Sequence, residues 1–202
     1  MEPPRTTVTA VILAGGRSTR FGSDKGLVTW RGRRLVDHVL DRLPVERDGT
    51  VLVIREEQDD GSWPGVTIVH DDPQRNEGPL RGVIRGLAAC RTDWAWVVAC
   101  DQPLISADLL LALQKSFLPD DHALLPEWNG RLQPLNALYA VNSGPLLAEL
   151  ETGGEQSLIG ALKTVSFRVF TEEECRRFDR RGAGFLNINR PEQFTDLEGY
   201  ES

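Results

Sequence analysis

The sequence has few of the residues that build disulfide frameworks or resident metal sites. It contains three cysteines, an odd number, and Cys90, Cys100 and Cys175 show neither C-x-x-C spacing nor a metal-type cluster. The pattern disfavours a disulfide framework, and a reducing, cytoplasmic location fits better. We expect Cys100 to be a small buried apolar residue, since free cysteine is among the most buried residue types.

Long hydrophobic runs are missing as well. The N-terminal stretch MEPPRTTVTA is polar and lacks the apolar core of a signal peptide. The longest apolar runs fall far short of the roughly 20 residues that span a bilayer. The net charge of −7 disfavours non-specific binding to nucleic acid or to an anionic membrane, because like charges repel. The sequence thus predicts an intracellular protein with no membrane and no nucleic-acid partner.

Segments with strand patterns alternate with segments of helical spacing along the chain. This alternation predicts an α/β fold with a mostly parallel sheet, in one domain over residues 1–202 with its core at about 7–197. Ligands bind such sheets at the carboxyl ends of the strands. The predicted strands are 7–14, 51–54, 66–69, 94–100, 123–126, 135–141 and 165–170, and the predicted helices are 35–43, 79–89, 107–117, 145–150, 157–163 and 191–197.

Some residues that often carry function are interpreted as structural. His38 lies in a helical pattern beside Asp37, and we expect it on the surface of that helix. Trp94 and Trp96 stand at the start of a strand, where packing is the expected role.

A segment rich in glycine and cations follows the first predicted strand. In LAGGRSTRFGSDKGL, Gly15 and Gly16 allow a sharp turn whose exposed N–H groups bind anions. Arg17, Arg20 and Lys25 add three cations within nine residues, and the arginine fork suits phosphate. The loop matches neither the dinucleotide motif G-x-G-x-x-G nor the Walker A sequence. It predicts a site for a polyphosphate such as a nucleoside triphosphate.

The same segment resembles the L-A-G-G-x-S-x-R-x-G-x-D-K signature of the MobA-like nucleotidyltransferases, whose best-known members are molybdenum cofactor guanylyltransferases. The resemblance runs from about residue 9 to residue 194. It implies a three-layer, Rossmann-like nucleotidyltransferase fold and transfer of GMP from GTP to a molybdenum-bearing pterin phosphate. The implied partners are GTP, this molybdopterin-type phosphate and molybdoenzyme maturation proteins. The implied nucleotide-binding residues of this loop are Leu13, Ala14, Gly15, Gly16 and Lys25, and the implied catalytic ones are Arg17, Arg20 and Lys25.

Asp101 ends the buried stretch in WVVACDQPLI. A carboxylate at the carboxyl end of a strand faces the ligand crevice, and Mg²⁺ takes one or two carboxylates plus phosphate oxygens. The segment resembles the family's C-D-x-P motif, whose aspartate holds magnesium, so Asp101 is assigned to catalysis, to nucleotide binding and to the metal, Mg²⁺. Capping of the next helix is the structural alternative, but Ser106 is the better cap.

A pair of aspartates lies in HDDPQRNEGPLRG. The spacing back from the G-P-L-x-G motif favours Asp71 as a nucleotide contact, with Asp72 a near competitor and an Asx turn the structural alternative for either. Gly82 would allow close backbone approach. Family members often carry an asparagine at the end of the second strand, where this chain has Ile54 or Arg55, so one nucleotide contact is altered.

The segment FLNINRPEQF resembles the family's closing F-x-N-x-N-x-P-E motif. Asn187 and Asn189 are two residues apart on an extended stretch, so their side chains share a face. The resemblance implies that this face lies near the pterin, the second substrate. Hydrogen bonding at the edge of a sheet is the alternative role.

Three alternatives to guanylyl transfer stay open. They are cytidylyl transfer to the same cofactor, sugar-phosphate nucleotidyl transfer, and a carrier module that binds nucleotide or pterin without catalysis. The cytidylyl counterpart more usually begins its loop with Ala-Ala-Gly and lacks the Asp-Lys pair, so Gly15-Gly16 and Asp24-Lys25 favour the guanylyl branch. The presence of Asp101 and the loop cations disfavours a carrier.

Overall fold

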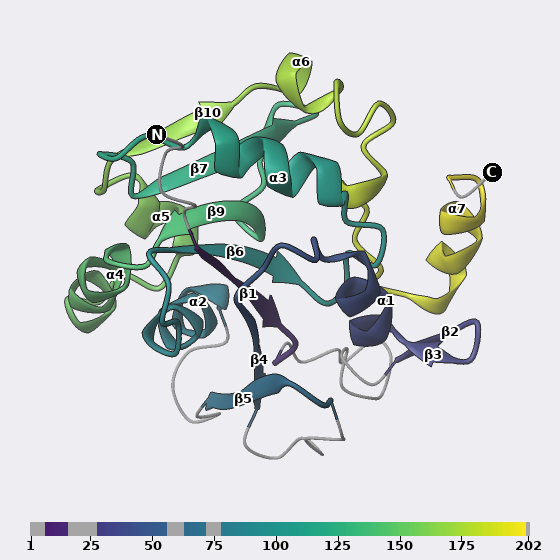
Figure 1. Cartoon of the computed structure of the whole chain (residues 1–202), viewed down its shortest axis with the longest axis horizontal. Coiled ribbons are helices and arrows are strands. Elements are labelled where there is room, and N and C mark those ends of the chain that lie inside the picture. The colour runs from purple at the N-terminus through teal and green to yellow at the C-terminus, as the bar shows by residue number, and fades with distance from the viewer. Residues whose placement is uncertain (1–6, 16–27, 56–62, 72–77, 201–202) are drawn as a thin grey trace.

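Strand β1 (Val8–Leu13) lies at the centre of the sheet in the computed structural model, which describes residues 7–15, 28–55, 63–71 and 78–200 (Figure 1). Its first five residues are buried. It pairs in parallel with β4 (Gly49–Arg55) on one side and with β6 (Trp94–Ala99) on the other. Because the strand is buried on both faces and paired on both edges, its sequence is a continuous apolar run.

The strands follow the order β10-β7-β9-β6-β1-β4-β5, with β8 paired to β7. Within this sheet the described pairings are parallel except those of β9 with its two neighbours and that of β8 with β7. The predicted, mostly parallel sheet is confirmed. The remaining strands of this sheet are β5 (Val66–Asp71), β7 (Ala123–Trp128), β8 (Arg131–Leu132), β9 (Asn136–Ala140) and β10 (Phe167–Phe170).

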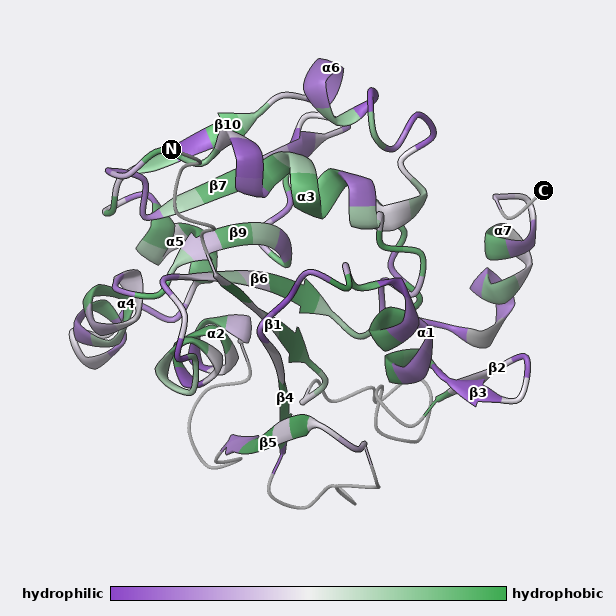
Figure 2. Cartoon of the chain, in the orientation of Figure 1, coloured by the Kyte–Doolittle hydropathy of each residue, from purple (hydrophilic) through white to green (hydrophobic). Residues whose placement is uncertain are grey.

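Helices cover both faces of the sheet, which gives the three-layer arrangement that was predicted (Figure 1). Alternate side chains of β4 enter two separate apolar cores: Leu52 and Ile54 face one, and Val51 and Val53 face the other. Figure 2 shows this concentration of apolar residues on the central strands. The first core is covered by α1 (Leu35–Arg42) and α3 (Ala107–Ser116), and the second by α2 (Pro79–Ala88), α4 (Ser143–Thr152) and α5 (Leu158–Leu162).

Several local predictions are confirmed in the described ranges. Ser106 caps α3, because its side chain accepts a hydrogen bond from Leu109 N at 3.2 Å. Trp96 and Cys100 are buried, and the Trp94 ring packs on Phe117 with centroids 4.8 Å apart. In these ranges no helix combines the length and apolar character that crossing a membrane would require.

Some short elements were not predicted or differ in extent. A hairpin of β2 (Thr29–Trp30) and β3 (Arg33–Arg34) precedes α1, and α6 (Glu172–Cys175) follows β10. The capping box at α6, T-x-x-E, is a signal in the sequence that could have predicted that helix. The last predicted helix divides into a 3₁₀ turn (Pro191–Gln193) and α7 (Phe194–Glu198).

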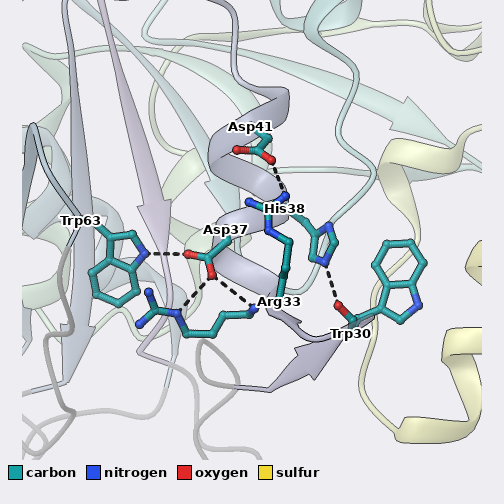
Figure 3. Close-up of polar contacts among 7 residues, drawn as sticks. Trp30, Arg33, Asp37, His38, Asp41 and Trp63 are labelled. Carbon is teal, nitrogen blue, oxygen red and sulfur yellow. Dashed lines mark hydrogen bonds and ion pairs between the residues drawn. The ribbon is translucent and has the colours of Figure 1, made fainter.

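His38 is buried, so the prediction of a surface position was wrong. It is 8% exposed, and its Nε2 lies 3.0 Å from Trp30 O (Figure 3). The two rings lie 4.8 Å apart between centroids. The hairpin places Trp30 against α1 and covers a face that the helical pattern alone left exposed.

Asp37, one residue earlier on α1, holds two neighbouring side chains. Trp63 Nε1 donates to its Oδ1 at 2.8 Å (Figure 3). Arg34 Nε donates to its Oδ2 at 3.2 Å. The Arg34 guanidinium lies over the Trp63 ring, 4.2 Å from its centroid. Burial by itself raises the pKa of Asp37, but the hydrogen bonds from Trp63 and Arg34 together lower that pKa below its usual value.

We expect Asp37→Asn to reduce the free energy of unfolding by about 1 kcal/mol at pH 7, because charge-assisted hydrogen bonds are lost. A carboxylate with a lowered pKa stabilises the fold above its unfolded pKa of about 4, and this stabilisation is lost as the pH falls through the folded-state pKa. The difference between wild type and variant should therefore shrink below about pH 4. Urea unfolding at pH 7, 5 and 3 measures the free energy of unfolding of both proteins, with Asp120→Asn as an exposed control. The same difference in this free energy at all three pH values would contradict a lowered pKa of Asp37.

Candidate functional site

The end of β1 lies between the ends of β4 and β6. Ala14 N donates to Val53 O at 2.8 Å, and Cys100 N donates to Leu13 O at 3.0 Å. Asp101 follows Cys100 directly, so the structure brings it close to the start of the glycine loop. Of the residues predicted to bind nucleotide, Leu13, Ala14, Gly15 and Asp101 thus meet at the carboxyl edge of the sheet.

The end of β4 resolves an ambiguity in the sequence. Ile54 is buried in the apolar core on the α1 side, whereas Arg55 lies next in the strand and shares its face with Val53. A Cβ on Gly15 would lie 3.3 Å from Arg55 Cγ, so the stem of Arg55 covers Gly15. Arg55, and not Ile54, is therefore the residue at this edge of the site.

Asp71 ends β5 and is the register partner of Arg55. Arg81, in the first turn of α2, places its Nε 3.1 Å from Asp71 Oδ1, and the two side chains are 12% and 18% exposed, respectively. Glu151 Oε1 lies 4.0 Å from Arg81 Nη1. The ion pair orients the Asp71 carboxylate at this edge of the sheet. Sequence reasoning missed Arg81, although its place in the first turn of a predicted helix could have indicated it.

Helix α2 is pressed closely against β1 through its glycines. A Cβ on Gly82 would touch Leu13 Cδ2 at 3.4 Å, and a Cβ on Gly86 would overlap Val11 Cγ1. The helix begins at Pro79, its N-cap Gly78 offers no side-chain cap, and Arg81 in its first turn contacts Asp71. The first turn of a helix carries the positive end of the helix dipole, which favours anions.

The C-terminal segment passes beside Asp101. Ile188 N donates to Asp101 O at 2.8 Å. Ile188 is buried, whereas Asn187 is exposed and Asn189 is partly exposed. This alternation is what an extended segment with both asparagines on the face opposite Ile188 would give. Their role toward a second substrate stays a prediction.

The predicted residues form a row across the carboxyl edge. From β5 to β6 the order is Asp71, Arg55, Gly15 and Asp101, and the segment around Ile188 follows. Three inter-strand spacings cover about 14 Å, which suits an extended ligand. Asp101 lies between the two ends of this row. Gly16, Arg17, Arg20, Lys25 and Asp72 lie outside the described residues, and their assigned roles stay predictions.

The residues at the carboxyl edge of the sheet suit a metal ion that binds together with a phosphorylated ligand. Within the described ranges no cluster of three or more histidine, cysteine, aspartate or glutamate side chains could hold a metal. Mg²⁺ in nucleotide sites takes one or two carboxylates and completes its shell with phosphate oxygens and water. A single partly exposed carboxylate, that of Asp101, fits this donor set.

These features define the class of protein: an α/β domain with Gly15, Arg55, Asp71 and Asp101 at the carboxyl ends of parallel strands, the edge at which such folds bind ligands. The profile of the MobA-like NTP transferase domain matches residues 10–165, and the chain belongs to this family. The family resemblance of the sequence motifs is thereby confirmed.

Relatives and solved structures agree with this assignment. The chain is 34% identical over 197 residues to a molybdenum cofactor guanylyltransferase of Pseudomonas putida, covering 97% of this chain and 100% of the relative. A structure of molybdopterin-guanine dinucleotide biosynthesis protein A from Archaeoglobus fulgidus is similar, with a TM-score of 0.79, 24% identity, and coverage of 95% and 97%. A 2-C-methyl-D-erythritol 4-phosphate cytidylyltransferase from Thermus thermophilus gives a TM-score of 0.72, 14% identity, and coverage of 96% and 98%. The predicted nucleotidyltransferase fold is confirmed.

Proposed function

We propose that this chain is a single-domain, Mg²⁺-dependent molybdenum cofactor guanylyltransferase. It transfers GMP from GTP to the phosphate of molybdenum-molybdopterin, giving the guanine dinucleotide cofactor and pyrophosphate. The observation that carries the proposal is the position of Asp101, between the glycine loop of β1 and the segment that holds Asn187 and Asn189. The relative from Pseudomonas putida, which bears this activity in its name, aligns over 97% of the chain.

The nucleotide occupies the half of the edge formed by β1, β4 and β5. Backbone N–H groups of the loop at Gly15 and Gly16 bind the phosphates, together with Arg17, Arg20 and Lys25. The Asp71 carboxylate, oriented by Arg81 at 3.1 Å, accepts hydrogen bonds from the N1–H and N2–H₂ groups of guanine. This places the α-phosphate toward Asp101.

The transfer is an in-line displacement. An oxygen of the acceptor phosphate bonds to the α-phosphorus of GTP, the bond from that phosphorus to the β-phosphate oxygen breaks, and pyrophosphate leaves. The acceptor oxygen is already anionic near neutral pH, so no strong general base is needed. Catalysis then depends on positioning and on charge neutralisation, which the loop cations provide. Asp101 would hold Mg²⁺, which offsets phosphate charge when bound.

The acceptor binds on the other half of the edge. Asn187 and Asn189 present amide groups on one face beside Asp101, where they can hydrogen-bond a pterin or its phosphate. We place the reaction in the cytoplasm and expect molybdoenzyme maturation proteins to receive the product.

Isothermal titration with GTP, CTP, ATP and UTP, each with and without Mg²⁺, tests the proposal. We expect selective binding of GTP that Mg²⁺ strengthens, because Asp71 accepts from the donor edge of guanine. A preference for CTP would assign the chain to cytidylyl transfer by the same mechanism. Failure to bind any of the four nucleotides, with the pterin acceptor present, would contradict the proposal.

A further inference from the structure

Strand β9 contains one amide side chain among apolar residues. Asn136 is fully buried and lies opposite Val98 of β6. On the same face of β9, the following core positions are Leu138 and Ala140. A buried amide lowers stability unless it is hydrogen-bonded, so its bonds indicate why an asparagine stands here.

Asn136 makes one side-chain connection to a distant part of the chain. Its Nδ2 donates to Gly184 O at 2.9 Å, across 48 positions of sequence. Among the described residues no group donates to its Oδ1. The amide therefore serves to hold the beginning of residues 183–189, which we call the strap.

The beginning of the strap is also held from a second side. The Asp179 carboxylate accepts from Ala183 N at 3.0 Å and from Gly184 N at 2.8 Å. A Cβ on Gly184 would lie 3.1 Å from Asp179 Oδ2 and 3.3 Å from Ile105 Cα. Gly184 thus has its carbonyl, its N–H group and its Cα all fixed by neighbours.

The far end of the strap carries the candidate acceptor residues. The bond from Ile188 N to Asp101 O fixes the main chain there, and the Ile188 side chain packs in an apolar cluster with Trp30 and Leu104. Three residues separate Gly184 from Ile188, and the four steps from Cα to Cα span at most about 14 Å. Asn187 lies within this short span, so a shift of Gly184 moves it relative to Asp101.

We propose that Asn136 is a positioning residue for the acceptor substrate. It holds Gly184 and so keeps Asn187 and Asn189 oriented beside Asp101. The inference rests on the proposed function, because it assigns the strap to the acceptor side of that reaction. Among the described residues, Leu13 to Gly15 and Asp71 make no hydrogen bond to Asn136, and the bond from Ile188 N in the strap reaches the backbone oxygen of Asp101, so we expect GTP binding to change little in an Asn136 variant.

The test is Asn136→Leu, which keeps the volume and burial but removes the donor. With GTP saturating and molybdenum-molybdopterin varied, we expect the acceptor KM to rise about five- to tenfold, the effect of about one net hydrogen bond. The Kd of GTP should stay within about twofold of wild type by the same scale. Hydrogen exchange at the Ile188 amide should be faster in the variant, whereas a purely structural role in the core would leave it unchanged.

A matched control removes the same kind of bond elsewhere. Ser143 is buried, and its Oγ donates to Ala140 O at 2.7 Å at the opposite end of β9. Ser143→Ala should leave the acceptor KM unchanged. Asp179→Asn weakens the other hydrogen bonds that hold the beginning of the strap, those from Ala183 N and Gly184 N. This variant should also raise the acceptor KM, so the proposal can still be tested if Asn136→Leu does not fold.

The outcomes separate the two proposals. No transfer by the unaltered protein, with both substrates and Mg²⁺ present, would overturn the proposed function and this inference with it. Transfer by wild type together with an unchanged acceptor KM in the strap variants would overturn this inference alone. An equal loss of GTP affinity and acceptor affinity would also overturn it, since that result indicates general loosening of the site.

Discussion

Replacement of Asp101 with alanine should reduce Mg²⁺-stimulated GMP transfer about a thousandfold or more, because stabilisation of phosphate charge by a bound metal contributes several kcal/mol. The fold should persist. The side chain is partly exposed in the turn after β6, and the contact with Ile188 uses the backbone oxygen of Asp101, which the substitution retains. Loss of turnover would therefore reflect loss of the carboxylate and not displacement of the C-terminal segment.

The measurement is kcat with and without Mg²⁺, accompanied by titration of GTP under both conditions. Asp101→Asn is the sharper variant, because it keeps the shape of the side chain and removes its charge. Asp120→Ala, at an exposed carboxylate, is the control and should behave like wild type. Turnover close to that of wild type in both Asp101 variants, at saturating Mg²⁺, would show that another group holds the metal.

Gly86→Ala should lower the free energy of unfolding by about 1–3 kcal/mol, although alanine is the better helix former. In a helix interior, alanine in place of glycine raises stability by about 0.5–1 kcal/mol through its higher helix propensity. Its Cβ would overlap Val11 Cγ1 and lie 3.4 Å from Val53 Cγ2. Val11 is fully buried and stiff about χ1, so it cannot move away and α2 must separate from β1. The loss of packing is larger than the gain in helix propensity.

Gly82→Ala on the same helix is the matched control. Its Cβ would make an ordinary contact with Leu13 Cδ2 at 3.4 Å, so stability should be unchanged or higher by up to about 1 kcal/mol. Urea unfolding of the two variants measures the difference. Equal stability of Gly86→Ala and Gly82→Ala would show that α2 and β1 do not pack as closely as described. If nucleotide needs close backbone approach at Gly82, its alanine variant also raises the Kd of GTP without loss of stability.

The sequence by itself determined the fold class, most of its elements and the placement of Gly15 and Asp101 at the carboxyl ends of strands. Buried parallel strands are apolar on both faces, so β1 and β6 are visible as short apolar runs, and their carboxyl ends locate Gly15 and Asp101. Ser106 was visible as a cap because capping is local chemistry within one turn. The greater exposure of Asn187 and Asn189 on either side of the buried Ile188 likewise follows the alternation expected of an extended segment.

Tertiary structure alone decided which distant groups meet. The choice of Arg55 over Ile54 at the edge depends on strand register, and the pairing of Asp71 with Arg81 depends on where α2 crosses the sheet. His38 is buried because a separate hairpin brings Trp30 against α1. Asn136 contacts Gly184 across 48 positions of sequence. A hydrophobic pattern of period 2 or 3.6 shows on which face of its own strand or helix a residue lies. It does not show which other element packs against that face, so the contact partner is decided only in the tertiary structure.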